Sequence, residues 1–157
     1  MKRKVTIPLA LLLVGAFATM AFAASDEERA KELQKERTKL EKETDPVDRA
    51  KIAIKISDIL VEEVGDSVRE GNFTEMETEL AAYAKTIEAA HKTLVDSGRN
   101  AVKKPAGFKE MEIALRRHVR KFEEFARVLN LQRRVPIEQT KDLATGIRDK
   151  LLKALFQ

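Results

Sequence analysis

The sequence has two histidines and no cysteine, so any transition-metal or haem chemistry depends on His91 and His118. Glu88 and His91 have the E-x-x-H spacing, which puts a carboxylate and an imidazole on adjoining faces of a helix, as in carboxylate-bridged di-iron bundles. Such a site needs a second pair of this kind, but Leu115-Arg116-Arg117 precede His118. Glu88, His91 and His118 are therefore the candidate metal ligands, and the sequence favours histidines near the edge of a core.

Haem is the second cofactor to consider, because Met76 and Met111 recur at spacings typical of a helical core. Periplasmic four-helix cytochromes hold haem inside the bundle through histidine and methionine. The sequence has no C-x-x-C-H motif, so a haem would be held by axial ligands alone. Methionine at core spacing is typical of packing, and we expect no cofactor.

Basic side chains recur along one face of the segment 108–130. Lys109, Arg116, Arg120 and Arg127 lie within about 20° of one direction on a helical wheel, away from the apolar face. This basic stripe is either a docking surface for an anionic partner or a solvated face with i,i+4 pairs between glutamate and arginine. The partner-binding candidates are the four stripe residues and the linker residues Arg99, Lys103 and Lys104.

Catalysis has little support in the sequence. Two histidines on separate helices, no cysteine and no glycine-framed serine do not provide a nucleophile, a base and an orienting group. The many carboxylates fall on solvent faces, where nothing would raise their pKa. We therefore expect that the protein is not an enzyme.

The elements that position these residues follow an N-terminal segment typical of a secretory signal peptide. It has a basic head (Met1 to Lys4), an apolar run (Val5 to Phe22) and the small-residue end Ala21-Phe22-Ala23. We expect residues 1–24 to be removed and the mature protein to be periplasmic or secreted. The alternative is an uncleaved anchor, because the run is about as long as a membrane-spanning helix. Only then would the membrane be a partner.

Charge is unevenly distributed once the signal segment is set aside. The chain has 30 basic and 26 acidic residues, and Lys2, Arg3 and Lys4 belong to the signal, which leaves 27 against 26. Nucleic acid is therefore not expected as a partner. Residues 25–96 carry 12 basic and 19 acidic side chains, and residues 97–157 carry 15 and 7. The two halves are complementary, within one molecule or between molecules.

Apolar periodicity and a composition rich in Ala, Glu, Lys and Leu predict an all-α fold. We expect an antiparallel up-and-down bundle of four main helices in a domain over 45–157, preceded by a charged helix over 25–44. Ser25, Asp45 and Thr74 are the expected caps of the first three helices, which end near residues 43, 71 and 98. The last two are expected over 108–130 and 136–155, since Arg133 to Pro136 should interrupt the helical pattern.

Two resemblances add to this interpretation. Arg69 to Met76 (REGNFTEM) resembles the turn of a tetratricopeptide repeat, although no second repeat follows and Leu60, Glu63 and Val64 replace its Trp/Leu/Gly signature. Asp45 to Lys51 and Lys103 to Arg120 make the chain similar to short exported bacterial all-helical proteins of unknown function. The resemblances imply a helical fold and an exported context.

We therefore predict an exported, non-enzymatic interaction protein whose partner is a protein or an anionic component of the envelope. One alternative is a periplasmic bundle that binds metal or haem. The other is a self-associating structural or chaperone-like protein, with a homo-oligomer formed through the narrow stripe Ala30, Leu33 and Leu40 of the first helix.

Overall fold

All regular structure in the described part of the chain is helical. The structure is a computed structural model that describes the backbone of residues 13–157 and the side chains from Asp26 onward; residues 1–12 of the predicted signal segment lie outside it. It contains five helices and no strand in this range, so the predicted all-α class is confirmed. No helix among these residues combines the length and apolarity needed to cross a bilayer.

Helix α1 (Leu13–Lys42) runs through Ser25 without a break, so the prediction that Ser25 caps a new helix is wrong. The alanine-rich sequence before Ser25 favours helix, and the helix simply continues. The chain divides into two compact units, residues 1–34 and 35–157. In the second unit, Arg49 Nη1 donates to the carbonyl oxygens of Leu40 at 2.8 Å and of Glu43 at 2.6 Å, which satisfies the end of α1.

Helix α2 (Pro46–Glu70) begins and ends as its sequence predicts. The Asp45 carboxylate accepts from the backbone N–H groups of Val47 at 2.9 Å and Asp48 at 3.0 Å. Pro46 occupies the first turn, where its missing N–H costs nothing. Gly71 closes the helix in the left-handed conformation at φ 73°.

Helix α3 (Phe73–Asp96) starts earlier than predicted, and the expected Thr74 cap is wrong. Its N-cap is Asn72, whose side-chain amide donates to Glu75. The left-handed Gly71 leaves only one residue before the new helix, so Thr74 already lies in its first turn. Gly98, at φ 66°, follows the end of α3 as predicted.

Helix α4 (Phe108–Val128) follows the linker at a glycine that no other residue could replace without strain. Gly107 has φ 88°, and a Cβ there would lie 2.7 Å from Leu94 Cδ2 and 3.5 Å from Val47 Cα. Its N–H donates to Glu110 Oε2 at 2.6 Å, which satisfies one free donor near the helix start. The linker is therefore held against α2 and α3.

Helix α5 (Leu131–Phe156) begins a full turn before the predicted start at Pro136. Asn130 caps it by accepting from the Arg133 backbone N–H at 3.1 Å. Arg133 also lies over the Phe73 ring, with 4.4 Å between the guanidinium carbon and the ring centroid. Pro136 is tolerated because it lies near the helix start and removes only one hydrogen bond.

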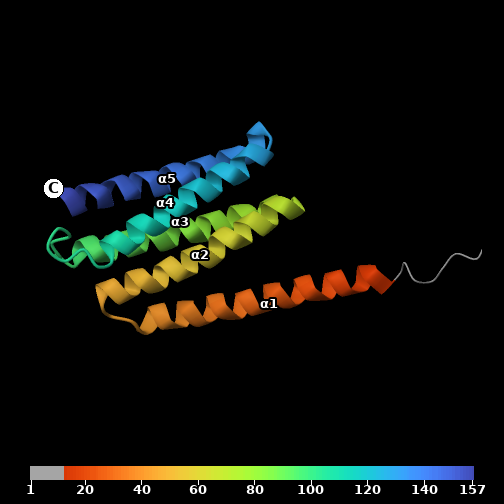
Figure 1. Cartoon of the computed structure of the whole chain (residues 1–157), viewed down its shortest axis with the longest axis horizontal. Coiled ribbons are helices and arrows are strands. Elements are labelled where there is room, and N and C mark those ends of the chain that lie inside the picture. The colour runs from red at the N-terminus through yellow and green to blue at the C-terminus, as the bar shows by residue number, and fades with distance from the viewer. Residues whose placement is uncertain (1–12) are drawn as a thin grey trace, which may run out of the picture. The chain divides into compact units, whose positions relative to one another are not determined.

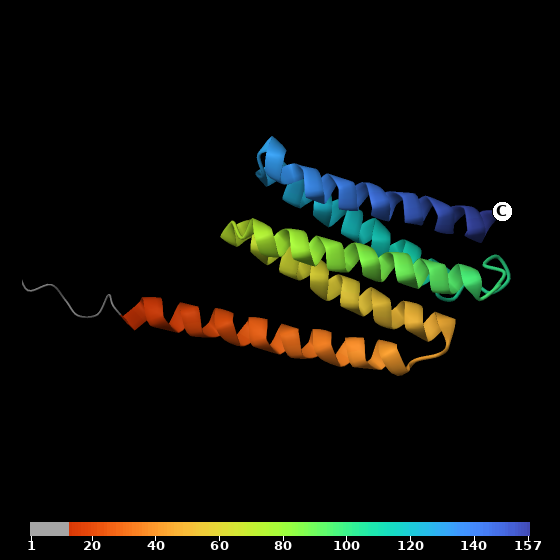
Figure 2. The same cartoon turned by 180° about the vertical axis from the view of Figure 1, so that it is seen from behind.

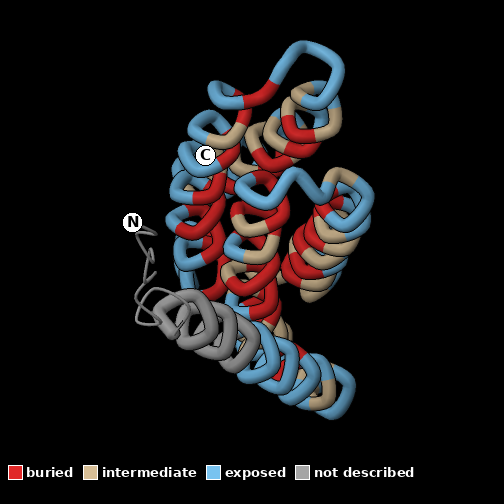
Figure 3. Tube along the Cα trace, turned by 90° about the vertical axis from the view of Figure 1, so that its right-hand side faces the viewer, coloured by how far each residue is buried: buried red, intermediate tan, exposed pale blue. Residues whose placement is uncertain are grey.

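Helices α2 to α5 enclose the core. Helix α2 packs on α3, α4 packs on α5, and the two pairs meet through α2 with α4 and α3 with α5. Figures 1 and 2 show these four helices side by side, and Figure 3 shows their buried residues facing one another. The largest fully buried side chains include Tyr83, Phe122, Leu60, Met76, Leu94 and Ile137.

Candidate functional site

An open groove lies between α4, α5 and the linker, with a volume of about 510 Å³. Lys109, Ile113 and Arg116 line it from α4, at positions that share one helix face. The α5 wall and the linker are mainly apolar. Their members are Leu152, Leu155, Phe156, Ala101, Val102 and Pro105. The groove therefore combines an apolar lining with cationic side chains.

Glu112 links the two helices at one end of the groove. It is 8 % exposed, and its Oε1 accepts from Arg148 Nε of α5 at 3.0 Å. The Arg116 guanidinium is 3.9 Å from the other carboxylate oxygen, which is a loose contact. One buried carboxylate is thus flanked by two arginines. Together with Lys109, these charged residues give the groove lining a net charge of +2.

A second, shallower hollow adjoins the groove on the outer face of α4. It has a volume of about 420 Å³, and five of its six lining residues are charged. They are Arg116, Arg117, Arg120, Lys121 and Glu124. Ile113 and Arg116 belong to both hollows, so the cationic surface is continuous along about three turns of α4.

The structure brings together some of the predicted partner-binding residues and separates others. Lys109 and Arg116 line the groove, and Arg120 lines the adjoining hollow. Arg127 is exposed farther along α4 and lines neither. Lys103 and Lys104 are exposed in the linker beside the groove residue Val102, while Arg99 is half-buried with its Nε unpaired.

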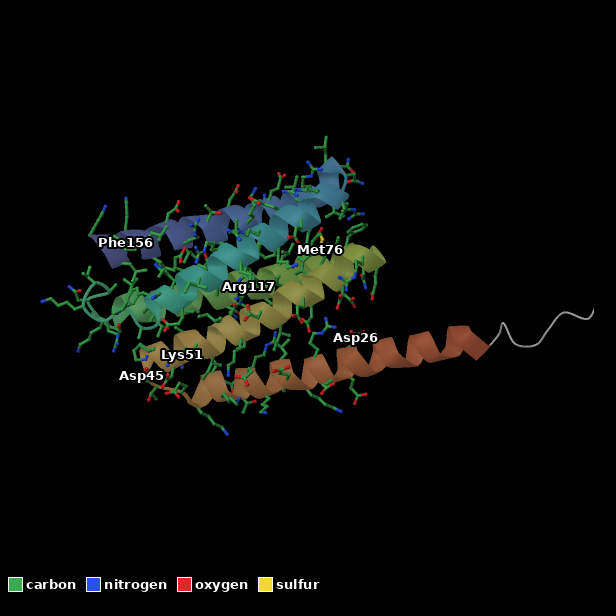
Figure 4. All side chains as sticks on the ribbon, viewed as in Figure 1. Asp26, Asp45, Lys51, Met76, Arg117 and Phe156 are labelled. Atoms are coloured by element: carbon green, nitrogen blue, oxygen red, sulfur yellow. The ribbon has the colours of Figure 1, made fainter. Side chains whose placement is uncertain are left out.

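A polar chain crosses the core from α3 to the surface of α2. The Tyr83 hydroxyl is 3.1 Å from His118 Nδ1, and His118 Nε2 is 2.6 Å from Asp58 Oδ1. A carboxylate only accepts, so Nε2 donates to Asp58, while the Tyr83 hydroxyl pairs with Nδ1 on the other side of the ring. Arg117 of α4, which is labelled in Figure 4, donates to the same Asp58 oxygen. Burial raises the pKa of Asp58, but the hydrogen bonds from His118 and Arg117 outweigh it and hold this pKa below its ordinary value.

This polar chain offers no room for a substrate. Tyr83 is fully buried and His118 is 2 % exposed. The cavity beside His118 has a volume of about 10 Å³, close to the minimum for one water molecule. Burial also raises the pKa of Tyr83 well above its ordinary value, so the phenol stays protonated. The geometry suits a contact that fixes the positions of α2, α3 and α4.

The remaining candidate metal and haem ligands lie apart from the hydrogen-bonded group of Tyr83, His118 and Asp58. Glu88 is exposed and His91 is half-buried on α3. Burial, aided by Lys150, lowers the pKa of His91. Met76 and Met111 are buried. Among residues 26–157, no three histidine or carboxylate side chains form a group that could hold a metal ion.

Sequence reasoning missed Arg148, Arg117 and Lys121. Arg117 and Lys121 are adjacent to stripe residues in the sequence and were available from the same helical wheel. Arg148 is recognisable only from the pairing of α4 with α5, because Glu112 is 36 residues away. Asp58 and His118 are 60 residues apart, and no local pattern connects them.

Comparisons with protein-family models, curated proteins and solved structures find no match for this chain.

Proposed function

We propose that this protein is an exported, non-enzymatic interaction protein. In this proposal the helices form an antiparallel four-helix bundle, preceded by a charged N-terminal helix, that presents α4 to an anionic partner. The partner is a protein or an anionic component of the cell envelope. The composition of the N-terminal segment supports export, because a basic head, an apolar run and a small-residue end are typical of signal peptides.

The observation that supports this proposal most is the set of uncompensated cations along α4. Lys109, Arg120 and Arg127 are exposed, and within residues 26–157 no carboxylate lies within 4.0 Å of their charged groups. Charges of this kind are fully hydrated in the free protein and are available to an anionic surface. The two adjoining hollows also make this surface concave, which suits a bound partner better than a flat, solvated helix face does.

The test compares two quadruple variants in capture experiments with an envelope fraction from the native source. One variant changes Lys109, Arg116, Arg120 and Arg127 to Gln. The matched control changes the exposed residues Lys42, Lys55, Lys85 and Lys92 to Gln, which alters net charge equally without touching α4.

We expect the α4 variant to lose about tenfold or more of the capture that the unchanged protein and the control variant retain. Circular dichroism spectra should show all three proteins folded with the same helical content at the assay temperature, because every substituted side chain is exposed. If both variants lose capture equally, net charge and not the α4 surface is responsible, and the proposed surface is wrong.

A further inference from the structure

The groove between α4, α5 and the linker has opposite chemical character at its two ends. Arg148 meets Glu112, which sets the register of the antiparallel pair. Phe156 lies eight residues beyond Arg148, or about 12 Å along the helix. In Figure 1 and Figure 2 the C-terminus lies at the same end of the bundle as the linker. The cationic end is therefore about 12 Å from the apolar end.

The apolar end exposes side chains that a folded protein usually covers. Phe156 is 80 % exposed and Val102 is 55 % exposed, and Ile113 is 40 % exposed beside the Glu112–Arg148 contact. Figure 4 labels Phe156 at the free end of α5. All three residues border the same groove, whereas Val128, Leu131 and Val135 are exposed near the turn between α4 and α5.

The cationic end has unused capacity for an anion. Arg148 uses its Nε for Glu112, and Arg116 is only loosely placed at 3.9 Å from the same carboxylate. A guanidinium has five N–H donors, so both arginines have several left for an incoming oxyanion. Lys109 lies seven residues before Arg116, about 10 Å along α4 toward the linker, so it lines the middle of the groove and is not part of its cationic end.

We propose that this groove binds a single-chain anionic amphiphile, with its acidic head at Arg116 and Arg148 and its alkyl chain directed toward Phe156. An extended chain advances roughly 1.2 Å per bond, so ~12 Å accommodates about ten carbons. The volume of about 510 Å³ falls in the range of small-ligand sites. This inference rests on the proposed function, since it specifies the anionic partner of the same surface.

A helical peptide fits the groove less well. The lining extends over two turns of each helix, and stable protein partners usually contribute a surface of about 800 Å² from twenty or more residues. A bilayer surface would require a broad apolar face, whereas here the apolar side chains line a hollow. The gradient from cations to apolar side chains matches one amphiphile lying lengthwise.

The test titrates the purified protein with decanoate below its micelle concentration, using calorimetry and decanol as the neutral match. We expect saturable binding of decanoate, with decanol about tenfold weaker or more. Affinity should rise about threefold to fourfold per methylene from octanoate to decanoate, and then level off beyond dodecanoate as the groove is filled.

Three variants assign the two ends. R116Q should weaken decanoate binding about tenfold and leave decanol binding unchanged, whereas F156S should weaken both. R127Q, on the same helix but outside the groove, should change neither. Because Arg116, Phe156 and Arg127 are exposed, all three variants should keep the melting behaviour of the unchanged protein.

Several results would overturn the inference. They are the absence of saturable decanoate binding, equal affinity for decanol, binding to anionic lipid vesicles that decanoate does not displace, or tighter binding of an acidic amphipathic peptide. If decanoate does not bind but the α4 variant still loses capture, this inference fails and the proposed function stands. If decanoate binds but capture is independent of α4, the groove is a ligand site and the proposed function fails.

Discussion

At the scale of single residues, Asp58 is a charged side chain that links α2 to α4. Its carboxylate accepts from His118 and Arg117, and these hydrogen bonds lower its pKa in spite of partial burial. The unfolded chain therefore takes up the proton at a higher pH than the folded protein. The stabilisation is complete above the ordinary value of 3.8 and is lost as the pH falls through the lowered folded value.

We predict that D58N lowers the free energy of unfolding at pH 7 by about 1 kcal/mol, since the carboxylate is 40 % exposed and partly screened by solvent. Urea unfolding at pH 7 and at several values below 4 measures the effect. The difference between the two proteins should shrink to near zero in acid. A difference that stays constant with pH would show that the charge of Asp58 is not responsible.

Gly107 provides a second prediction at this scale, with a matched control in the same chain. G107A should lower the free energy of unfolding by about 3 kcal/mol, because its φ of 88° disfavours a side chain and the new Cβ would clash with Leu94. Gly146 is an exposed residue in the middle of α5, and a Cβ there would meet no other atom. G146A should therefore raise the free energy of unfolding by about 1 kcal/mol. Urea unfolding of both variants measures this; equal losses would contradict it.

Which side chains are buried could be predicted from the sequence where helical spacing alone decides it. Tyr83 and Leu115 fall on apolar faces and are buried. The role of His118 could not be predicted, because a histidine near an apolar face is compatible with several partners. Its partners Tyr83 and Asp58 are 35 and 60 residues away, and only the packing of three helices brings them together.

At the scale of elements, the start of α5 is fixed by the Asn130 cap together with two further contacts. Asn130 accepts from the Arg133 N–H, and the first turn also has the contact of Arg133 with Phe73 and the bond from Arg134 to the Leu129 carbonyl at 3.1 Å. We predict that N130A costs about 1 kcal/mol and speeds amide exchange over residues 131–136. N130D keeps the acceptor and should match the unchanged protein, so an equally destabilised N130D would contradict this role.

The elements themselves could largely be predicted from the sequence, and their boundaries could not always. Asp45 and Gly71 define α2 because an acceptor before proline and a left-handed glycine are strong local signals. Pro136 is an equally strong signal for a helix start, and it was misleading because Asn130 and the Phe73 contact extend α5 backwards. The groove depends on two elements meeting, so the sequence predicted only its α4 wall.

At the scale of the whole molecule, the two packed helix pairs carry opposite charge. Residues 46–96, which contain α2 and α3, have eleven acidic and six basic side chains, a net charge of −5. Residues 108–156, which contain α4 and α5, have seven acidic and twelve basic side chains, a net charge of +5. The pairs are in contact through α2 with α4 and α3 with α5, so their long-range attraction favours the folded state.

Salt should therefore lower the stability of the folded protein. Raising NaCl from about 0.01 M to about 0.3 M shortens the screening length from about 30 Å to less than 10 Å, comparable to the spacing of packed helices. We predict that the free energy of unfolding falls by about 1 kcal/mol over this range, as measured by urea unfolding. R117Q removes an ion pair between the two helix pairs and should reduce the salt dependence. Stability that rises over the same range would mean that screening of repulsion within each pair outweighs the attraction between them.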